Sequence, residues 1–165
     1  MPAVLHQGYR PGCIGRIVEL HARYYAARAG FGSAFEAKVA RELADFCSAF
    51  QPDRDGLWLV VQDGQVEGSI AIDGACADEH GAHLRWFILS DAIRGQGLGR
   101  QLLDSAIGHV DARQYRQTHL WTFAGLDAAR HLYEAVGFQL AHEASGDQWG
   151  TVVSEQRFER LLKAC

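Results

Sequence analysis

The 165-residue sequence lacks the marks of several specialised protein classes. No apolar run approaches the roughly 20 residues that a membrane-spanning helix needs, and Met1-Pro2-Ala3 does not begin a secretory signal. We therefore expect a cytoplasmic protein with no membrane partner. Positive charge is not in excess either, since the formal net charge is −4, and this argues against a nucleic-acid partner.

Metal-binding spacing is also missing. The sequence contains four cysteines, Cys13, Cys47, Cys76 and Cys165, and none of them forms a C-x-x-C pair. Cys13 and Cys47 fall on helical patterns, where a small buried hydrophobe is the simpler interpretation. His80 and His83 lie close together, but no second pair accompanies them, so we expect no metal.

Two common phosphate-binding fingerprints and the usual nucleophile patterns are absent as well. No glycine run is followed by Lys-Ser or Lys-Thr, which excludes a P-loop. Gly95, Gly97 and Gly99 read G-x-G-x-G and are followed by Arg100, so the dinucleotide fingerprint G-x-G-x-x-G is not formed. No convincing Ser-His-Asp or Cys-His arrangement occurs.

What the sequence does contain is a glycine-rich turn between an apolar strand and an amphipathic helix. The turn consists of Arg94, Gly95, Gln96, Gly97, Leu98, Gly99 and Arg100. An extended run, Leu84–Leu89, precedes it, and helical spacing of apolar residues follows as far as Val110. Glycines let the backbone approach a ligand, and free N–H groups at a helix start attract anions. We expect a phosphate-bearing ligand here; the alternative is a turn in which glycines only permit the bend.

A second motif occupies residues 119 to 138. An apolar strand gives way at Ala124-Gly125 to a helix with one apolar face. That face consists of Leu126, Ala129, Leu132, Tyr133 and Val136. Gly137 follows at the position favoured for a left-handed cap, so the helix should end there.

These two motifs resemble those of the GNAT acetyltransferase superfamily. Arg94-x-x-Gly97-x-Gly99 is similar to the R/Q-x-x-G-x-G/A pyrophosphate turn of that family. Ala129, Tyr133, Gly137 and Phe138 match its A-x-x-x-Y-x-x-x-G-F signature. Residues 8 to 50 look like acetyltransferase domains fused to MarR-type regulators. This last likeness rests on Gly8-Tyr9-Arg10-Pro11-Gly12, His21 to Tyr25 and Phe35-Glu36-Ala37.

Length and pattern predict one domain, residues 1–165, of the α/β (α+β) class. We expect a strand at 3–9, a helix from about 14 to 25, and a second helix capped by Ser33 with Glu36 in a capping box. A hairpin should join 57–62 to 66–72 through Asp63-Gly64, residues 73 to 81 should form an exposed turn, and 138–143 should pair with 151–158. The resemblance implies a mixed, mostly antiparallel sheet of six to seven strands flanked by four helices.

By resemblance, the protein is an acetyl-CoA-dependent N-acetyltransferase that moves an acetyl group directly to a primary amine of a small molecule or peptide. Residues 94 to 100 would hold the pyrophosphate of coenzyme A. The main chain of Phe87, Ile88 and Leu89 would bind the pantetheine arm and supply an oxyanion donor. Tyr133 would act as general acid on the departing thiolate. The alternative for Tyr133 is a core tyrosine.

The resemblance also leaves several points open. Phe123 lies where many members carry Asn, and Asp91 lies where proline is common. The general base is not identifiable among its four candidates, which are Glu36, His21, His83 and Glu79. Tyr24, Tyr25, Phe31 and Phe35 are candidates for the wall of the acceptor pocket. Other functions to be tested are a non-catalytic acyl-CoA-binding regulatory module and binding of a different phosphate ligand, and a homodimer is one open oligomeric state.

Overall fold

Seven strands form one sheet in the order β1-β2-β3-β4-β5-β7-β6 in the computed structural model, which describes residues 1–164. The strands are β1 (Val4–Gln7), β2 (Gly56–Gln62), β3 (Gln65–Asp73), β4 (Ala82–Leu89), β5 (Gln117–Phe123), β6 (Gln139–Gly146) and β7 (Val153–Leu161). Neighbouring strands are antiparallel except β4 and β5, which are parallel. The predicted mixed, mostly antiparallel sheet is therefore confirmed.

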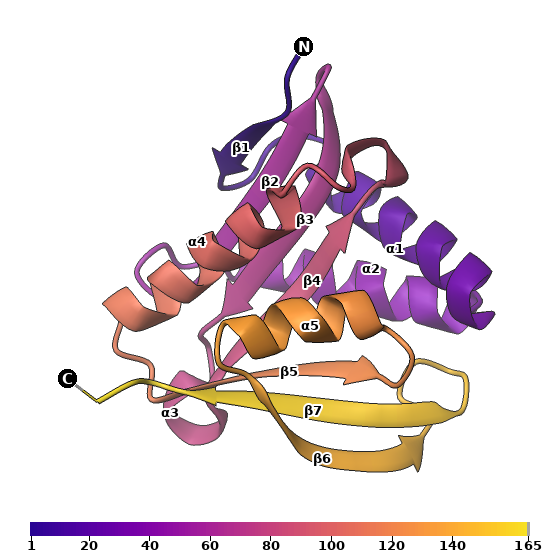
Figure 1. Ribbon diagram of the computed structural model, residues 1–165. Coiled ribbons are helices and arrows are strands. Elements are labelled where there is room, and N and C mark those ends of the chain that lie inside the picture. Colours follow the sequence, from indigo (N-terminus) through magenta and orange to yellow (C-terminus); the bar gives the residue numbers. More distant parts are fainter. Residues whose placement is uncertain (165) are drawn as a thin grey trace.

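Helices cover both faces of the sheet. The longer ones are α1 (Cys13–Ala29), α2 (Ser33–Ser48), α4 (Leu98–Ala112) and α5 (Asp127–Ala135). Figure 1 shows α4 and α5 on the near face of the sheet and α1 and α2 behind it. Among the described residues, no helix has both the length and the apolar character needed to cross a membrane.

The apolar composition of β2 follows from its burial by helices on both faces of the sheet. Leu57 and Leu59 pack into the apolar core under α1 and α2, whereas Trp58 and Val60 pack into the core under α4. A strand that is buried on both faces needs apolar residues at every position, so it reads as a continuous apolar run.

A β-bulge interrupts the pairing of β3 with β4. Ser69 lies opposite Ile88 and Ala71 lies opposite Arg85, so two residues of β4 face the single residue between Ser69 and Ala71. Trp86 has a φ of 50° at this point, which is uncommon for a residue other than glycine. The bulge sends the Trp86 side chain into the core under α1 and α2, while Phe87 packs against the core under α4 and α5.

The strands β4 and β5 separate soon after they begin. Their pairing is limited to Ala82 with Thr118 and His83 with His119. Figure 1 shows the two strands diverging beyond this point. One edge of β4, from Leu84 to Leu89, therefore has no strand beside it.

Two local predictions differ from the structure. Ser33 is the first residue of α2 and not its N-cap; Gly32 precedes the helix, and its carbonyl oxygen accepts hydrogen bonds from the N–H groups of Phe35 and Glu36. The segment 73–81, predicted as a turn, contains the short helix α3 (Ala77–His80). Gly137 has the predicted positive φ, at 103°, just after α5.

The cysteines follow the sequence prediction where they are described. Cys13 is fully buried in α1 and Cys47 is partly buried in α2, and both are free thiols. Cys76 is exposed, and Cys165 lies outside the described residues.

Candidate functional site

The glycine-rich turn has open space in front of it and unpaired amides within it. Gly95 and Gly97 have φ values of 79° and 76°, and a Cβ built on either glycine meets no atom within 4 Å. Among residues 1–164, no protein acceptor bonds the main-chain N–H groups of residues 95–100. Because α4 begins at Leu98, these donors add to the positive end of the helix dipole.

Gly99 is needed for close packing and not for the geometry of the turn. A Cβ at this position would lie 3.1 Å from Leu89 and 3.7 Å from Leu132, which precedes Tyr133 on α5. The start of α4 is thus held closely against the end of β4 and against the helix that carries Tyr133.

The side chain of Arg94 fixes the start of the turn. Its guanidinium donates to the carbonyl oxygen of Leu89 at 3.0 Å and lies 2.7 Å from the carboxylate of Asp91. The same group stacks over the ring of Tyr24 at 4.6 Å. Tyr24, a candidate for the acceptor wall, therefore supports the turn from α1 and does not line the cleft described next.

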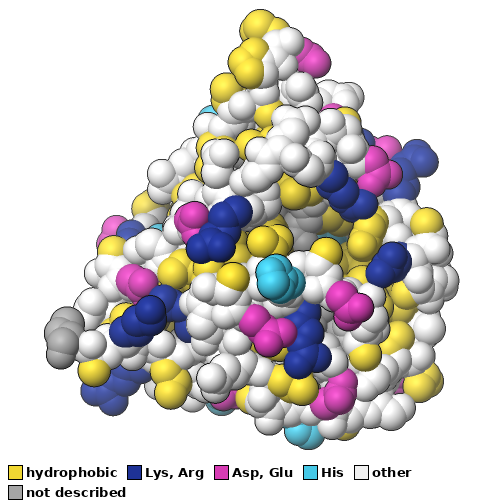
Figure 2. Space-filling model, in the orientation of Figure 1, with side chains coloured by type: hydrophobic (Ala, Val, Ile, Leu, Met, Phe, Trp, Pro, Cys, Tyr) yellow, Lys and Arg dark blue, Asp and Glu magenta, His cyan; other side chains and the backbone are white. Residues whose placement is uncertain are grey.

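A cleft of about 350 Å³ lies between α1, α2 and the diverging strands β4 and β5. Figure 2 shows that the surface is hollowed between α4, α5 and α1, and that hydrophobic and basic side chains border the hollow. The wall of the cleft is largely aromatic, with Tyr25, Phe31, Phe35, Phe123 and Trp149. Three of these, Tyr25, Phe31 and Phe35, were predicted from the sequence.

Tyr133 lines the same cleft. Its side chain is 7% exposed, and its ring lies 5.9 Å from that of Phe87 between centroids. Burial raises the pKa of Tyr133 well above its usual range, so the phenol stays protonated at neutral pH. Phe123, in place of an asparagine, packs on Phe31 and Trp149 and offers no amide to a ligand.

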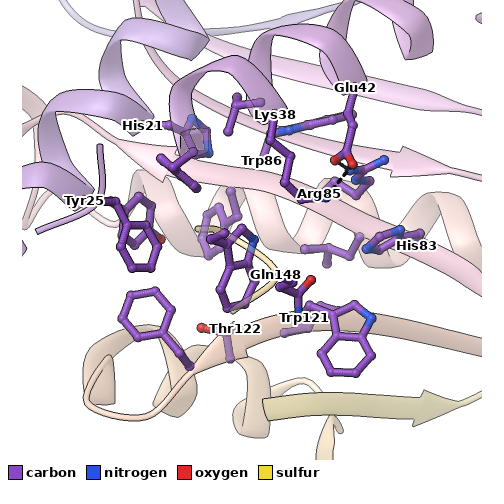
Figure 3. A pocket seen from close by; sticks show the side chains of 18 of the residues that line it. His21, Tyr25, Lys38, Glu42, His83, Arg85, Trp86, Trp121, Thr122 and Gln148 are labelled. Atoms are coloured by element: carbon purple, nitrogen blue, oxygen red, sulfur yellow. Dashed lines mark hydrogen bonds and ion pairs between the residues drawn. The ribbon is translucent and has the colours of Figure 1, made fainter. Parts of the chain in front are cut away.

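Charged side chains gather at one side of the cleft. The carboxylate of Glu42 pairs with Lys38 at 2.6 Å, one helical turn away on α2, and with Arg85 from β4. Figure 3 shows Lys38, Glu42, Arg85 and His83 on this side and Tyr25 on the other. The imidazole of His83 stacks on that of His119 at 4.4 Å, at the last residue pair before β4 and β5 part.

Two of the four base candidates line the cleft, His21 and His83, whereas Glu36 and Glu79 are exposed elsewhere. His21 is 5% exposed, and its Nδ1 lies 2.7 Å from the carbonyl oxygen of Ile17. Burial lowers the pKa of His21 to about 4, so its ring is neutral at pH 7. Burial and then the positive charge of Arg85 lower the pKa of His83 well below its usual range.

Sequence reasoning missed Lys38, Glu42, Arg85 and Trp149. Lys38 and Glu42 have the i, i+4 spacing of an ordinary solvated helix face, so that pattern carries no signal of a site. Arg85 did carry one, because it interrupts an apolar strand in which a charge is costly to bury.

Comparison with known proteins identifies a family with a similar sequence. The sequence matches the acetyltransferase (GNAT) family over residues 14–138. It is similar to N-acetylaspartate synthetases of Danio rerio (29% identical over 123 residues, 74% of this chain and 43% of that protein) and of Homo sapiens (29% over 142 residues, 83% and 45%). The chain spans less than half the length of these curated relatives.

Solved structures give the same fold. An acetyltransferase structure from Salmonella typhimurium, solved with its cofactor acetyl-CoA, superposes with a TM-score of 0.78 over 100% of this chain and 96% of that chain, at 16% identity. At this identity the likeness shows the fold alone. Because the family match includes both glycine motifs and three quarters of the chain, the protein belongs to the GNAT family of acetyltransferases.

Proposed function

We propose that the chain is an acetyl-CoA-dependent N-acetyltransferase that moves an acetyl group directly to a primary amine of a small molecule or peptide. Family membership supports the reaction type, and a fold neighbour solved with acetyl-CoA supports the cofactor. The observation that carries the proposal is the set of unpaired amides at residues 95–100, held close to the helix that bears Tyr133.

The turn would bind the pyrophosphate of coenzyme A. Successive N–H donors, two glycines with positive φ and the start of α4 form an anion-binding nest. Arg94 would contribute by keeping the turn in place, since its side chain is already engaged with Leu89 and Asp91. The open space in front of Gly95 and Gly97 leaves room for phosphate oxygens.

The open edge of β4 would bind the pantetheine arm. Phe87, Ile88 and Leu89 lie beyond the point where β5 diverges, so no strand pairs with them on that edge, and an extended ligand can do so. The carbonyl oxygen of Leu89 is the exception, because it already accepts from Arg94. An N–H group of this segment would also stabilise the tetrahedral oxyanion. The bulge at Trp86 lies immediately before these residues and determines where their N–H groups point.

Tyr133 would act as the general acid. In direct transfer the amine nitrogen bonds to the acetyl carbon, the carbon–sulfur bond breaks, and the thiolate accepts the phenolic proton. The proton lost by the nitrogen returns to Tyr133 through solvent, so atoms and charge balance. A phenol that stays protonated at neutral pH suits this role.

The amine must lose a proton before it attacks. For a lysine-like amine with a pKa near 10.4, the neutral form costs about 4.6 kcal/mol at pH 7. Of the candidate bases, His21 and His83 line the cleft, and each is neutral at pH 7 and so able to accept a proton. The lowered pKa of each imidazole makes it a weak base, so the sequence's four candidates are reduced to two but neither is assigned. Glu36 and Glu79 are not proposed, since both are exposed and lie outside the cleft.

The direct test is thiol release from acetyl-CoA in the presence of a panel of primary amines. An amine-dependent signal with formation of the N-acetyl product supports the proposal. Tight acetyl-CoA binding without turnover on any amine would favour a non-catalytic acyl-CoA-binding module, an alternative that Phe123 in place of Asn supports. Displacement of coenzyme A by ATP or NAD would point to a different phosphate ligand.

Further predictions from the sequence belong to the same proposal. One domain over residues 1–165, a cytoplasmic location, a homodimer and the likeness to domains fused to MarR-type regulators all stay predictions.

A further inference from the structure

The charged side of the cleft has more positive than negative groups. Among the described residues that line the cleft, Lys38 and Arg85 are cations and Glu42 is the one carboxylate. Glu42 is bound to both cations at once. Burial raises its pKa, but the hydrogen bond from Lys38 and the charge of Arg85 outweigh burial, so the pKa of Glu42 stays below its usual value and the group stays ionised.

On the cleft side of Arg85, neighbouring side chains do not remove the excess charge; the carboxylates of Asp45 and Asp73 lie with Arg54 around a second hollow that Arg85 also lines. His83 and His119 are neutral at pH 7, since burial lowers the pKa of both. The positive charge of Arg157 also lowers the pKa of both imidazoles, but Arg157 forms an ion pair with Glu159 at 3.0 Å. Within the lining of the cleft, Lys38, Arg85 and Glu42 together therefore leave one positive charge unbalanced, and the Arg85 side chain is only 19% exposed.

An amine that carries no other charge fits this cleft poorly. It arrives mostly as an ammonium ion, which Arg85 and Lys38 repel. A carboxylate on the acceptor reverses that interaction, because guanidinium and ammonium donors bind carboxylate oxygens through charge-assisted hydrogen bonds. An acceptor with both groups places negative charge at the cations and leaves its amine free to approach the acetyl group.

The size of the cleft limits how far apart the two groups can be. Arg85, Phe87 and Tyr133 all line the same cleft of about 350 Å³, although the bulge at Trp86 lies between Arg85 and Phe87 on β4. The Phe87 ring in turn contacts that of Tyr133 at 5.9 Å between centroids. A carboxylate at Arg85 and an amine near Tyr133 therefore fit one small molecule.

We infer that the acceptor is an amino acid, whose carboxylate is bound by Arg85 and Lys38 while its primary amine faces the acetyl group. This inference rests on the proposed function and adds the substrate class and two binding residues to it. The same chemistry is consistent with the two curated relatives, which are N-acetylaspartate synthetases.

Matched acceptors test the substrate class. Each amino acid is compared with the amine that carries no carboxylate: alanine and aspartate with ethylamine, asparagine with 3-aminopropanamide, and glutamine with 4-aminobutanamide. We expect kcat/KM to be at least 10-fold higher for the amino acid that keeps the carboxylate, given the usual strength of hydrogen bonds to charged groups. Equal or faster turnover of the decarboxylated amines, or of a peptide N-terminus, would overturn the inference.

Variants test the two residues. Arg85→Gln should lower kcat/KM for the best amino acid by about 10- to 100-fold, mainly through KM, whereas ethylamine turnover should not fall and acetyl-CoA affinity should stay the same. Lys38→Gln should do the same to a smaller extent. Arg41→Gln, an exposed position on the same helix as Lys38, is the control and should change neither substrate. An unchanged preference for amino acids in Arg85→Gln would overturn the assignment.

A binding measurement separates failure of the inference from failure of the proposed function. If no amine releases thiol, the transferase proposal fails, and calorimetry with N-acetylaspartate and its diamide still tests the carboxylate site in the presence of coenzyme A. Binding of N-acetylaspartate that is lost in Arg85→Gln supports the site. Equal binding of the diamide, or binding of neither compound, overturns it.

Discussion

The hydroxyl of Ser69 donates a hydrogen bond of 2.6 Å to the main-chain carbonyl oxygen of Trp86, the residue with a φ of 50° in the bulge of β4. Ser69 is fully buried on β3, and its bond spans the gap that the bulge opens between the two strands. A positive φ at tryptophan costs of order 1–3 kcal/mol and persists only when neighbours hold it. The Ser69 hydrogen bond therefore stabilises the bulge, and through it the position of Phe87 to Leu89.

Ser69→Ala should destabilise the protein and lower turnover together. The Trp86 carbonyl group would lose its partner inside the protein, at a cost of about 1–3 kcal/mol. The bulge would then relax, and the edge of β4 would hold a ligand less accurately. Urea unfolding and steady-state kinetics measure the two effects. Ser105→Ala removes a similar hydroxyl-to-carbonyl bond on α4 and should leave kcat unchanged; an equal loss of kcat in both variants would contradict this role.

Tyr133→Phe should lower kcat by about 10²-fold or more while leaving acetyl-CoA affinity nearly unchanged, since it removes only the proton donor. Steady-state kinetics and calorimetry measure the two quantities. Tyr115→Phe is the control, because the Tyr115 hydroxyl bonds the carbonyl oxygen of Arg54 at 2.8 Å, away from the cleft. Full turnover in Tyr133→Phe would remove the general-acid role.

Gly97→Val should abolish acetyl-CoA binding without unfolding the protein. The new side chain would occupy the open space in front of the turn and disfavour the φ of 76° that aims the amides. Circular dichroism and calorimetry measure folding and binding. Gly108→Val is the control: Gly108 lies on α4, which Gly97 precedes, a Cβ built on it also meets no atom within 4 Å, and this variant should keep normal affinity. Normal affinity in a folded Gly97→Val would rule out the nest.

Acid should destabilise the protein through His21. The pKa of this imidazole is about 4 in the folded protein, against 6.5 for an ordinary histidine, so between these pH values only the unfolded chain binds the proton. Stability is thus complete above pH 6.5 and falls as the pH drops toward 4, by about 2 kcal/mol at pH 5 from this group alone. Urea unfolding at pH 7 and pH 5 measures the loss.

Replacing His21 with a residue that cannot titrate isolates its contribution to the pH dependence of stability. His21→Gln keeps a donor for the carbonyl oxygen of Ile17 but cannot titrate, so the drop in unfolding free energy between pH 7 and pH 5 should shrink. His131→Gln, at an exposed position on α5, is the control and should leave the drop as it is. A drop of the same size in wild type and His21→Gln would contradict the assignment.

Local patterns predicted much of the fold. The helical spacing of Phe35, Val39, Leu43, Phe46 and Phe50 predicted the second helix, although α2 ends at Ser48, before Phe50. The glycine turn before Leu98 predicted the start of α4, because helix starts depend on neighbours in the sequence. The bulge could not be predicted in this way. Leu84 to Leu89 reads as a regular apolar strand, and the two-to-one pairing depends on Ser69, seventeen residues earlier than Trp86.

The residues on the acceptor side of the site could not be predicted from local sequence patterns for the same reason. Glu42 and Arg85 meet across α2 and β4, and Trp149 reaches the cleft from the segment between β6 and β7. Only the tertiary fold brings these residues together. The phosphate turn and Tyr133 could be predicted because each lies within one continuous motif.

A crystal structure of the protein with acetyl-CoA tests the central claim most directly. We predict that the diphosphate lies within hydrogen-bonding distance of main-chain N–H groups in residues 95–100 and that the thioester sulfur lies beside the Tyr133 hydroxyl. An empty turn, or amides of residues 95–100 bonded to protein carbonyl groups while coenzyme A binds elsewhere, would contradict it.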